Sequence, residues 1–368
     1  MVKIVLKSIP NLWKSAKYFL LLFGVLALVS SCTGDNTGGA DKNSGGITTK
    51  KGQLTLYTVR YGTMEKQLIS TFEERKGIKV KVVMDSPDAM VKRLKKEGQK
   101  TAADVVLLDN LVDMYAVKAA GVLQPFSTDS VAHAMPSRNT DNEGYWAGFT
   151  KYAMGYGCNK VAVPKPSVVN VYKDITGPYW NGRVILSKAS NKDNQFLVAT
   201  MIAEQGEATT RLWLRGLVNN LAIDPVENTQ AVIRAVAEGQ GEISLLNASQ
   251  YVRWTNSGST ENFETGNKVG VKIPYDSNMK SYYNLVSLGL TSNTKHRGDA
   301  LMFIDYLISK KNQEYYCDLT FEYPVNVFTL PSGFILDIGG FSEIELDFSG
   351  AAENLERAKT MMKEAGWK

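Results

Sequence analysis

The sequence predicts an α/β protein whose body consists of two lobes joined by a hinge. Stretches with the spacing of strands and helices alternate from residue 53 onward, and this alternation begins again near residue 183 after a long extended stretch. The body that follows residue 52 has about 315 residues, which exceeds the usual size of one hydrophobic core. We therefore expect two α/β units, the first of them with βαβ units on a parallel sheet.

The first lobe begins with a strand, a helix and a second strand. The helix pattern rests on Met64, Leu68 and Phe72, which recur at helical spacing between two stretches that alternate as strands do. A further helix, a mostly apolar strand and a third helix follow. The expected elements are 53–59, 63–76, 78–84, 89–97, 103–108 and 110–120. This order is typical of βαβ units.

The second lobe begins with a strand and continues with three helices, expected at 183–186, 194–205, 207–219 and 229–238. Two extended stretches, 146–159 and 281–290, connect the lobes, and the first contains Gly148, Gly155 and Gly157. Two crossings between two lobes define a hinge, and the cleft between such lobes encloses a ligand. The expected lobes are 53–150 with 276–330, and 151–275 with 331–368.

The first 31 residues have the layout of a secretory signal peptide, with four lysines, no acidic residue and an apolar run from Tyr18 to Val29. Cys32 follows this run directly in Val29-Ser30-Ser31-Cys32, which resembles the lipobox of bacterial lipoproteins. We expect residues 1–31 to be removed and Cys32 to be lipidated. An ordinary signal peptide or a membrane anchor is the alternative, although the run is short for a spanning helix. Residues 32–52 are polar and predict a flexible tether.

Charge and residue spacing exclude several classes of function. Four of the five excess positive charges lie in the expected signal peptide, and no basic stripe with aromatic residues remains to bind nucleic acid. The two histidines lack metal-ligand spacing, and no nucleophile stands beside a base, so we expect no enzyme. We expect a monomer. Cys158 and Cys317 are expected to be two buried thiols rather than a disulfide.

Short motifs run in order from about residue 53 to the C-terminus. They are LYTVR at 56–60, GIKV at 77–80, ADV at 103–105, LQP at 123–125, WNGRV at 180–184, NQFLVA at 194–199, VGV at 269–271, EYPVN at 322–326 and MKEAGWK at 362–368. They resemble the ferric-ion-binding periplasmic proteins, or bacterial transferrins, above all their tyrosine-rich cyanobacterial branch. The resemblance implies a type II periplasmic-binding-protein fold, Fe(3+) as transported ligand, and an ABC permease and ATPase as partners.

Several of the family's iron-ligand positions are altered in this chain. Tyr61 follows Arg60 in the place of the family's histidine, and Asp193 replaces a tyrosine in a Ser-Asn-x-Tyr-Asn-Gln motif. Tyr251 keeps the first position of an adjacent tyrosine pair whose second tyrosine is lost. On the second crossing, where the family often has Thr-His-Val-Asn, the chain reads Ser281-Tyr282-Tyr283-Asn284.

Ferric iron prefers hard anionic oxygen donors, so these positions suggest a metal site. The expected metal ligands are Tyr61, Asp193, Tyr251 and Tyr282, with Tyr283 and Asn284 as further residues of the cleft. Arg60 is expected to hold carbonate or phosphate as a synergistic anion.

Other interpretations of the same residues stay open. The tyrosines can form an aromatic wall, Asp193 can cap the helix that begins at residue 194, and Arg60 can form a salt bridge between the lobes. An iron chelate or a small anionic solute is the alternative cargo, and a ligand-sensing interaction lipoprotein is the alternative role. In each case we expect the protein on the periplasmic or cell-surface side of a bacterial membrane, anchored by lipid.

Overall fold

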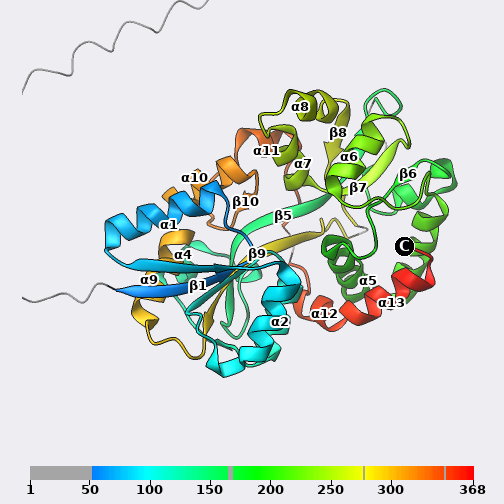
Figure 1. The fold of residues 1–368 in the computed structure, drawn as a ribbon. Coiled ribbons are helices and arrows are strands. Elements are labelled where there is room, and N and C mark those ends of the chain that lie inside the picture. The colour runs from blue at the N-terminus through cyan, green and yellow to red at the C-terminus, as the bar shows by residue number, and fades with distance from the viewer. Residues whose placement is uncertain (1–51, 165–168, 277, 344) are drawn as a thin grey trace, which may run out of the picture. The chain divides into compact units, whose positions relative to one another are not determined.

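The computed structural model describes residues 52–164, 169–276, 278–343 and 345–368. The expected signal peptide, the lipidation site Cys32 and nearly the whole expected tether lie outside these residues. The described part of the chain is an α/β fold built around a ten-stranded sheet (Figure 1). None of its helices is long and apolar enough to cross a membrane.

The main path of the sheet has the strand order β2-β1-β3-β9-β5-β7-β6. The pairs of β1 with β2, β1 with β3 and β6 with β7 are parallel, whereas β9 and β5 run antiparallel to their neighbours. Three short strands lie off this path: β4 pairs with β9, and β8 and β10 pair with β5. The bounds are β1 Gln53–Thr58, β2 Lys79–Met84, β3 Val105–Leu108, β4 Leu123–Gln124, β5 Trp146–Asn159, β6 Val184–Ile185, β7 Ile243–Asn247, β8 Val269–Lys272, β9 Tyr283–Thr291 and β10 Tyr323–Pro324.

Strand β5 belongs to two halves of the sheet. Its residues 146–153 pair with β9, and its residues 154–159 pair with β7 and β8 (Figure 1). We call the part with β1, β2, β3 and β9 the first half-sheet and the part with β6, β7 and β8 the second half-sheet. The chain entering β9 also joins the halves, because the Tyr282 carbonyl accepts a hydrogen bond from the Met154 amide at 3.0 Å.

Helices bury both faces of the first half-sheet. Val105 and Leu107 of β3 face a core that includes Phe72 of α1, whereas Val106 and Leu108 face the core that holds α2 and α3. This alternation follows from the two-residue period of a strand. The helices beside this half-sheet are α1 Thr63–Lys76, α2 Pro87–Glu97, α3 Leu111–Ala119, α4 Asp129–Ala134, α9 Arg297–Ile308 and α10 Lys310–Thr320.

The second half-sheet is packed among helices from two parts of the chain. Helix α5 contacts α12 and α13 near the C-terminus, while α6, α7 and α8 pack around β7 and β8. Gly206 interrupts α5 at φ 80°, which separates the two helices predicted at 194–205 and 207–219. The bounds are α5 Lys192–Asn219, α6 Thr229–Ala237, α7 Ala248–Thr255, α8 Thr260–Gly266, α11 Gly333–Asp337, α12 Phe348–Glu353 and α13 Leu355–Glu364.

The structure confirms the α/β prediction and corrects some of its details. Strand β6 covers only Val184–Ile185, shorter than expected. Asp193 does not cap α5, because this helix begins at Lys192 and the side chain of Asn191 accepts the Asp193 amide at 2.8 Å. Cys158 and Cys317 are buried free thiols, as predicted.

Candidate functional site

A polar pocket of about 260 Å³ lies where β1 and β3 end and where α3, α5 and α7 begin. Ligands of α/β folds bind beyond the carboxyl ends of parallel strands, so this place is expected for a solute. A larger hollow of about 680 Å³ beside α3 and α5 contains none of the expected site residues. We call the smaller one the central pocket, lined by Arg60, Pro87, Asp109, Asn110, Asp113, Tyr152, Asn191, Lys192, Asp193, Asn247, Gln250, Arg253 and Glu322.

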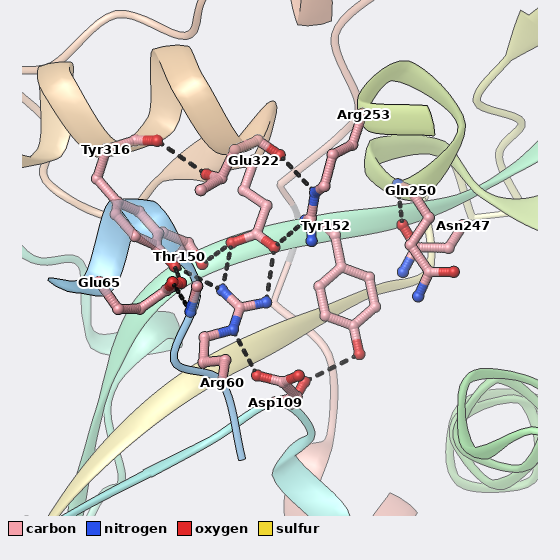
Figure 2. Close-up of polar contacts among 12 residues, drawn as sticks. Arg60, Glu65, Asp109, Thr150, Tyr152, Asn247, Gln250, Arg253, Tyr316 and Glu322 are labelled. Carbon is pink, nitrogen blue, oxygen red and sulfur yellow. Dashed lines mark hydrogen bonds and ion pairs between the residues drawn. The ribbon is translucent and has the colours of Figure 1, made fainter. Parts of the chain in front are cut away.

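Three asparagines start the helices that point their N-termini at the central pocket. The side chain of Asn110 accepts the Val112 amide of α3 at 2.9 Å. Asn191 does the same at α5, and Asn247 accepts the Gln250 amide of α7 at 3.0 Å (Figure 2). Each cap satisfies a backbone N–H that the first helical turn leaves free. The caps thereby fix the positions of the side chains beside them.

Arg60, which follows β1, is the centre of an ionic network (Figure 2). Its Nε lies 2.7 Å from Asp109 Oδ1, and its Nη1 and Nη2 donate to the two carboxylate oxygens of Glu322 at 3.0 and 2.9 Å. Nη1 also donates to the Tyr316 hydroxyl at 3.0 Å. Burial by itself lowers the pKa of Arg60, but Asp109 and Glu322 together raise that pKa well above its ordinary value. The guanidinium therefore stays charged.

Glu322 joins this network to α7. Its side chain is only 2% exposed, and it accepts further hydrogen bonds from Arg253 Nη2 at 2.7 Å and from Thr150 Oγ1 at 2.5 Å. Burial raises the pKa of Glu322, but the charges of Arg60 and Arg253 outweigh burial and lower the pKa to about 2. Glu322 is therefore an ionised buried carboxylate that contacts two arginines.

Tyr152 of β5 brings two aspartates together. Its hydroxyl lies 2.8 Å from Asp193 Oδ1 and 3.1 Å from the backbone carbonyl oxygen of Asp109. Asn247 Nδ2 donates to the other oxygen of Asp193 at 3.1 Å. Burial raises the pKa of Asp193, and it raises the pKa of Tyr152 well above its ordinary value. The phenol therefore keeps its proton at neutral pH unless a cation displaces it.

The remaining cation of the central pocket is also paired. Lys192 Nζ lies 2.8 Å from Asp88 Oδ1, and 2.9 and 2.8 Å from the two oxygens of Asp113. Arg60 and Arg253 are paired with Glu322. The pocket therefore presents no lysine or arginine without a carboxylate partner, whereas Tyr152 and Asp193 offer oxygen atoms.

The structure brings two of the sequence-predicted residues, Arg60 and Asp193, into the central pocket. Tyr251 of α7 is not among its lining residues, because its side chain points toward α8 and β8, with its hydroxyl 3.1 Å from the Gly266 carbonyl and 2.9 Å from the Val269 carbonyl. These contacts fix the end of α8 and the start of β8.

The other predicted aromatic residues also lie away from the central pocket. The ring of Tyr282 packs on Tyr172 with centroids 4.7 Å apart, and its hydroxyl lies 3.4 Å from Asp276. Tyr61 is partly buried, with the Lys66 amine 5.4 Å from its ring centroid.

The two further residues expected in the cleft are buried. Tyr283 is 1% exposed and packs against two aromatic rings, Phe341 and Phe348. Asn284 is buried and accepts the amides of Leu111 at 3.2 Å and Leu285 at 2.8 Å.

Sequence reasoning missed Tyr152, Asp109, Arg253 and Glu322. Two of them carried a usable signal, since Asp109 follows a buried strand directly and Tyr152 lies in the crossing predicted at 146–159. The sequence gives no signal that Glu322 is a partner of Arg60, because the two residues are 262 positions apart. Only the folded chain brings them together.

The side chains of the central pocket that could coordinate a metal ion do so through oxygen atoms. Within the described ranges, no three or more His, Cys, Asp or Glu side chains are close enough together to hold a metal ion. Tyr152 and Asp193 meet directly, and the Asp109 carboxyl lines the same pocket. A hard cation bound here would take phenolate and carboxylate oxygens.

Comparison with known proteins gives one family. Residues 67–327 match the family of bacterial extracellular solute-binding proteins. Iron uptake protein A1 of Synechocystis sp. is 30% identical over 316 residues, which cover 86% of this chain and 88% of that protein.

Solved structures agree with this assignment. A Trichodesmium protein (IdiA, FutA) in complex with iron and citrate has a TM-score of 0.82 and 29% identity, over 86% of this chain and all of that chain. A ferric binding protein from Campylobacter jejuni has a TM-score of 0.79 and 26% identity, with the same coverage. The fold is thus a periplasmic-binding-protein fold, as the motifs implied. The chain belongs to the bacterial extracellular solute-binding proteins, in the ferric-binding group of the cyanobacterial iron uptake proteins, a family of binding proteins rather than enzymes.

Proposed function

We propose that this protein is the receptor of an ABC-type importer and that it binds ferric iron in the central pocket. Solute-binding proteins of this family generally act with ABC permeases, and relatives of this chain are named for iron uptake or ferric binding. The proposed donors are Tyr152, Asp193 and Asp109. Asp193 is kept from the motif-based set, and we propose Tyr152 and Asp109 in place of its tyrosines, because the hydroxyls of Tyr251 and Tyr282 have partners outside the pocket.

The observation that carries the proposal is the placement of the Tyr152 hydroxyl. It lies between the Asp193 carboxylate at 2.8 Å and the Asp109 backbone at 3.1 Å, in a pocket whose arginines and lysine are already paired. An anion would meet only the partial positive charge of the three helix N-termini, because the arginines and the lysine are paired, whereas a cation would meet phenol and carboxylate oxygens. Ferric iron is a hard cation, which phenolate and carboxylate oxygens suit, and relatives of this chain are named for ferric binding.

The size of the pocket supports a second form of the cargo, in which iron arrives with a small carboxylate chelator. Its volume of about 260 Å³ corresponds to roughly nine water molecules at about 30 Å³ each, much more than one ion needs. The Trichodesmium relative was solved with iron and citrate. In this form the chelator completes the coordination that the protein donors begin.

A titration with two tyrosine variants tests the site. The full-length chain in detergent is titrated with ferric nitrilotriacetate, ferric citrate and citrate alone, and phenolate-to-iron charge transfer is followed by visible absorption. We expect a band with the ferric solutes and none with citrate. Tyr152→Phe should remove the band and weaken binding by on the order of 10- to 100-fold.

Tyr251→Phe is the matched control, because it deletes the same atom from a tyrosine outside the pocket. It should leave the band and the affinity unchanged. The opposite pattern, with the band lost in Tyr251→Phe and kept in Tyr152→Phe, would return the site to the motif-based set. A wild-type chain that binds citrate but neither ferric solute would replace ferric iron by a small anion as the cargo.

We also propose that the protein is exported, cleaved before Cys32 and anchored by lipid on that residue, with residues 32–52 as tether. The apolar run before a small-residue site and a cysteine supports export and lipidation. For the lobes we keep the boundaries that the sequence predicts. The anchor would keep the receptor beside its permease and ATPase. Mass spectrometry of membrane-extracted protein should find acylated Cys32 at the N-terminus, and an intact 1–31 segment would contradict it.

A further inference from the structure

The carboxylate of Glu322 is surrounded by donors as a bound anion would be. Oε1 accepts from Arg60 Nη2 at 2.9 Å and from Arg253 Nη2 at 2.7 Å. Oε2 accepts from Arg60 Nη1 at 3.0 Å and from Thr150 Oγ1 at 2.5 Å. A carboxylate has about four lone-pair sites, so these four bonds saturate it. The fork of Arg60 takes the bidentate geometry that arginine also uses for free carboxylates.

These donors come from separate parts of the fold. Arg60 follows β1, Thr150 lies in β5 and Arg253 lies in α7, beside the second half-sheet. Glu322 itself stands between α10 and β10 and is 2% exposed, whereas the side chain of Arg253 is 44% exposed. All three charged residues line the central pocket, so a small anion in the pocket would meet both arginines if the glutamate were absent.

We propose that Glu322 is a built-in counter-anion, which takes the place between Arg60 and Arg253 where an exogenous carbonate or phosphate would otherwise bind. This inference rests on the proposed function for its consequence, which is that the chain captures ferric solute without a synergistic anion. It differs from the expectation that Arg60 holds such an anion, because the guanidinium of Arg60 already contacts Glu322, Asp109 and Tyr316. By neutralising Arg60 and Arg253, Glu322 makes the pocket less attractive to a free anion.

The first test removes the counter-anion and offers a replacement, with no iron present. Glu322→Ala leaves two arginines around a space of carboxylate size. Formate or bicarbonate should raise the thermal unfolding midpoint of this variant, while chloride at the same ionic strength should raise it less. The unfolding midpoint of the wild type should be the same in formate and in chloride at equal ionic strength. Glu322→Gln is the matched control, because its amide fills the space and should prevent the formate-specific rise.

The second test measures ferric binding in buffers free of carbonate and phosphate. Wild-type affinity for ferric nitrilotriacetate should stay within about twofold when bicarbonate or phosphate is added. Glu322→Ala should bind at least tenfold more weakly, and formate should restore most of this loss. A purely structural role of Glu322 would give weaker binding that formate does not restore.

The outcomes separate this inference from the proposed function. A wild-type chain whose ferric affinity rises tenfold or more with bicarbonate or phosphate would overturn the built-in anion, and that measurement needs no variant to fold. An absent formate effect on Glu322→Ala would also overturn it. If the wild type binds no ferric solute, the proposed function fails. The formate shift without iron then still decides whether Glu322 occupies an anion site.

Discussion

At the scale of single residues, the central pocket is organised by paired charges. A buried charge left without a partner is strongly destabilising, so the buried carboxylate of Glu322 depends on Arg60 and Arg253. The bidentate contact of Arg60 with Glu322 and the contact of Arg253 with the same carboxylate satisfy this requirement. Because the arginines are used in this way, the oxygen atoms of Tyr152, Asp193 and Asp109 are the donors that we propose for a bound cation.

The low pKa of Glu322 predicts how stability depends on pH. The pKa falls from its ordinary value of 4.5 to about 2 in the folded chain, so this carboxylate stabilises the fold above pH 4.5 and loses that effect as pH falls toward 2. Between about pH 6 and pH 3, the wild type should lose about 2 kcal/mol more of unfolding free energy than Glu322→Gln. Urea unfolding at a series of pH values measures this.

A glutamate on the surface of α10 provides the control for that experiment. Glu314 is 50% exposed and pairs only loosely with Lys310, at 3.6 Å. Glu314→Gln should change the unfolding free energy by less than about 0.5 kcal/mol throughout the same pH range. Wild type and Glu322→Gln with parallel pH curves would contradict the stabilising role of the ionised carboxylate.

At the scale of elements, β5 connects the fold to the site. It is buried along its whole length, pairs with both half-sheets, and places Tyr152 in the pocket and Thr150 beside the Glu322 carboxylate. Its second part requires close approach to β7. A Cβ atom at Gly157 would lie 2.6 Å from a methyl carbon of Leu246 and 2.8 Å from Ser244 Oγ. Glycine is therefore needed where the strand enters the second half-sheet.

This packing predicts that Gly157→Ala is destabilising. The added methyl group must displace the buried side chains of Leu246 and Ser244, which should cost roughly 1–3 kcal/mol of unfolding free energy in a urea titration. Gly298→Ala is the control, because Gly298 is an exposed residue in the first turn of α9 with no atom within 4 Å of the added carbon. It should be neutral or stabilise by up to about 1 kcal/mol. Equal stabilities of the two variants would show that the side chains of Leu246 and Ser244 make room for the methyl group at no cost.

Local patterns made most elements predictable but not the pocket. The apolar strand before Asp109 and the extended stretch around Tyr152 are visible because each depends on neighbours within a few positions. The start of α5 differed by two residues, since Asn191 rather than Asp193 supplies the cap. A motif position identified Tyr251, yet sequence alone does not show that its hydroxyl faces the carbonyls of Gly266 and Val269.

At the scale of the described body, the donors of the pocket come from both sides of β5. Asp109 follows β3 of the first half-sheet, whereas Asp193 and Arg253 stand on α5 and α7, beside the second. Tyr152 lies in β5 just before the residues that pair with β7. Solute bound between these groups gains contacts from both halves at once, and a ligand shifts a conformational equilibrium only through such differential contacts.

The two halves should therefore close around ferric solute by bending near residues 149–156 and 281–286. A compact body of this length has a radius of gyration of about 20 Å, and hinge closure should reduce the value for the whole chain measurably. Small-angle neutron scattering with the detergent contrast-matched compares the full-length chain alone, with ferric citrate and with citrate. We expect a smaller radius only with the ferric solute, and no change for Tyr152→Phe at the same concentrations. An unchanged radius in a sample whose visible band shows saturation would mean that iron binds without hinge motion, so that the donors beside β5 already stand in their bound arrangement.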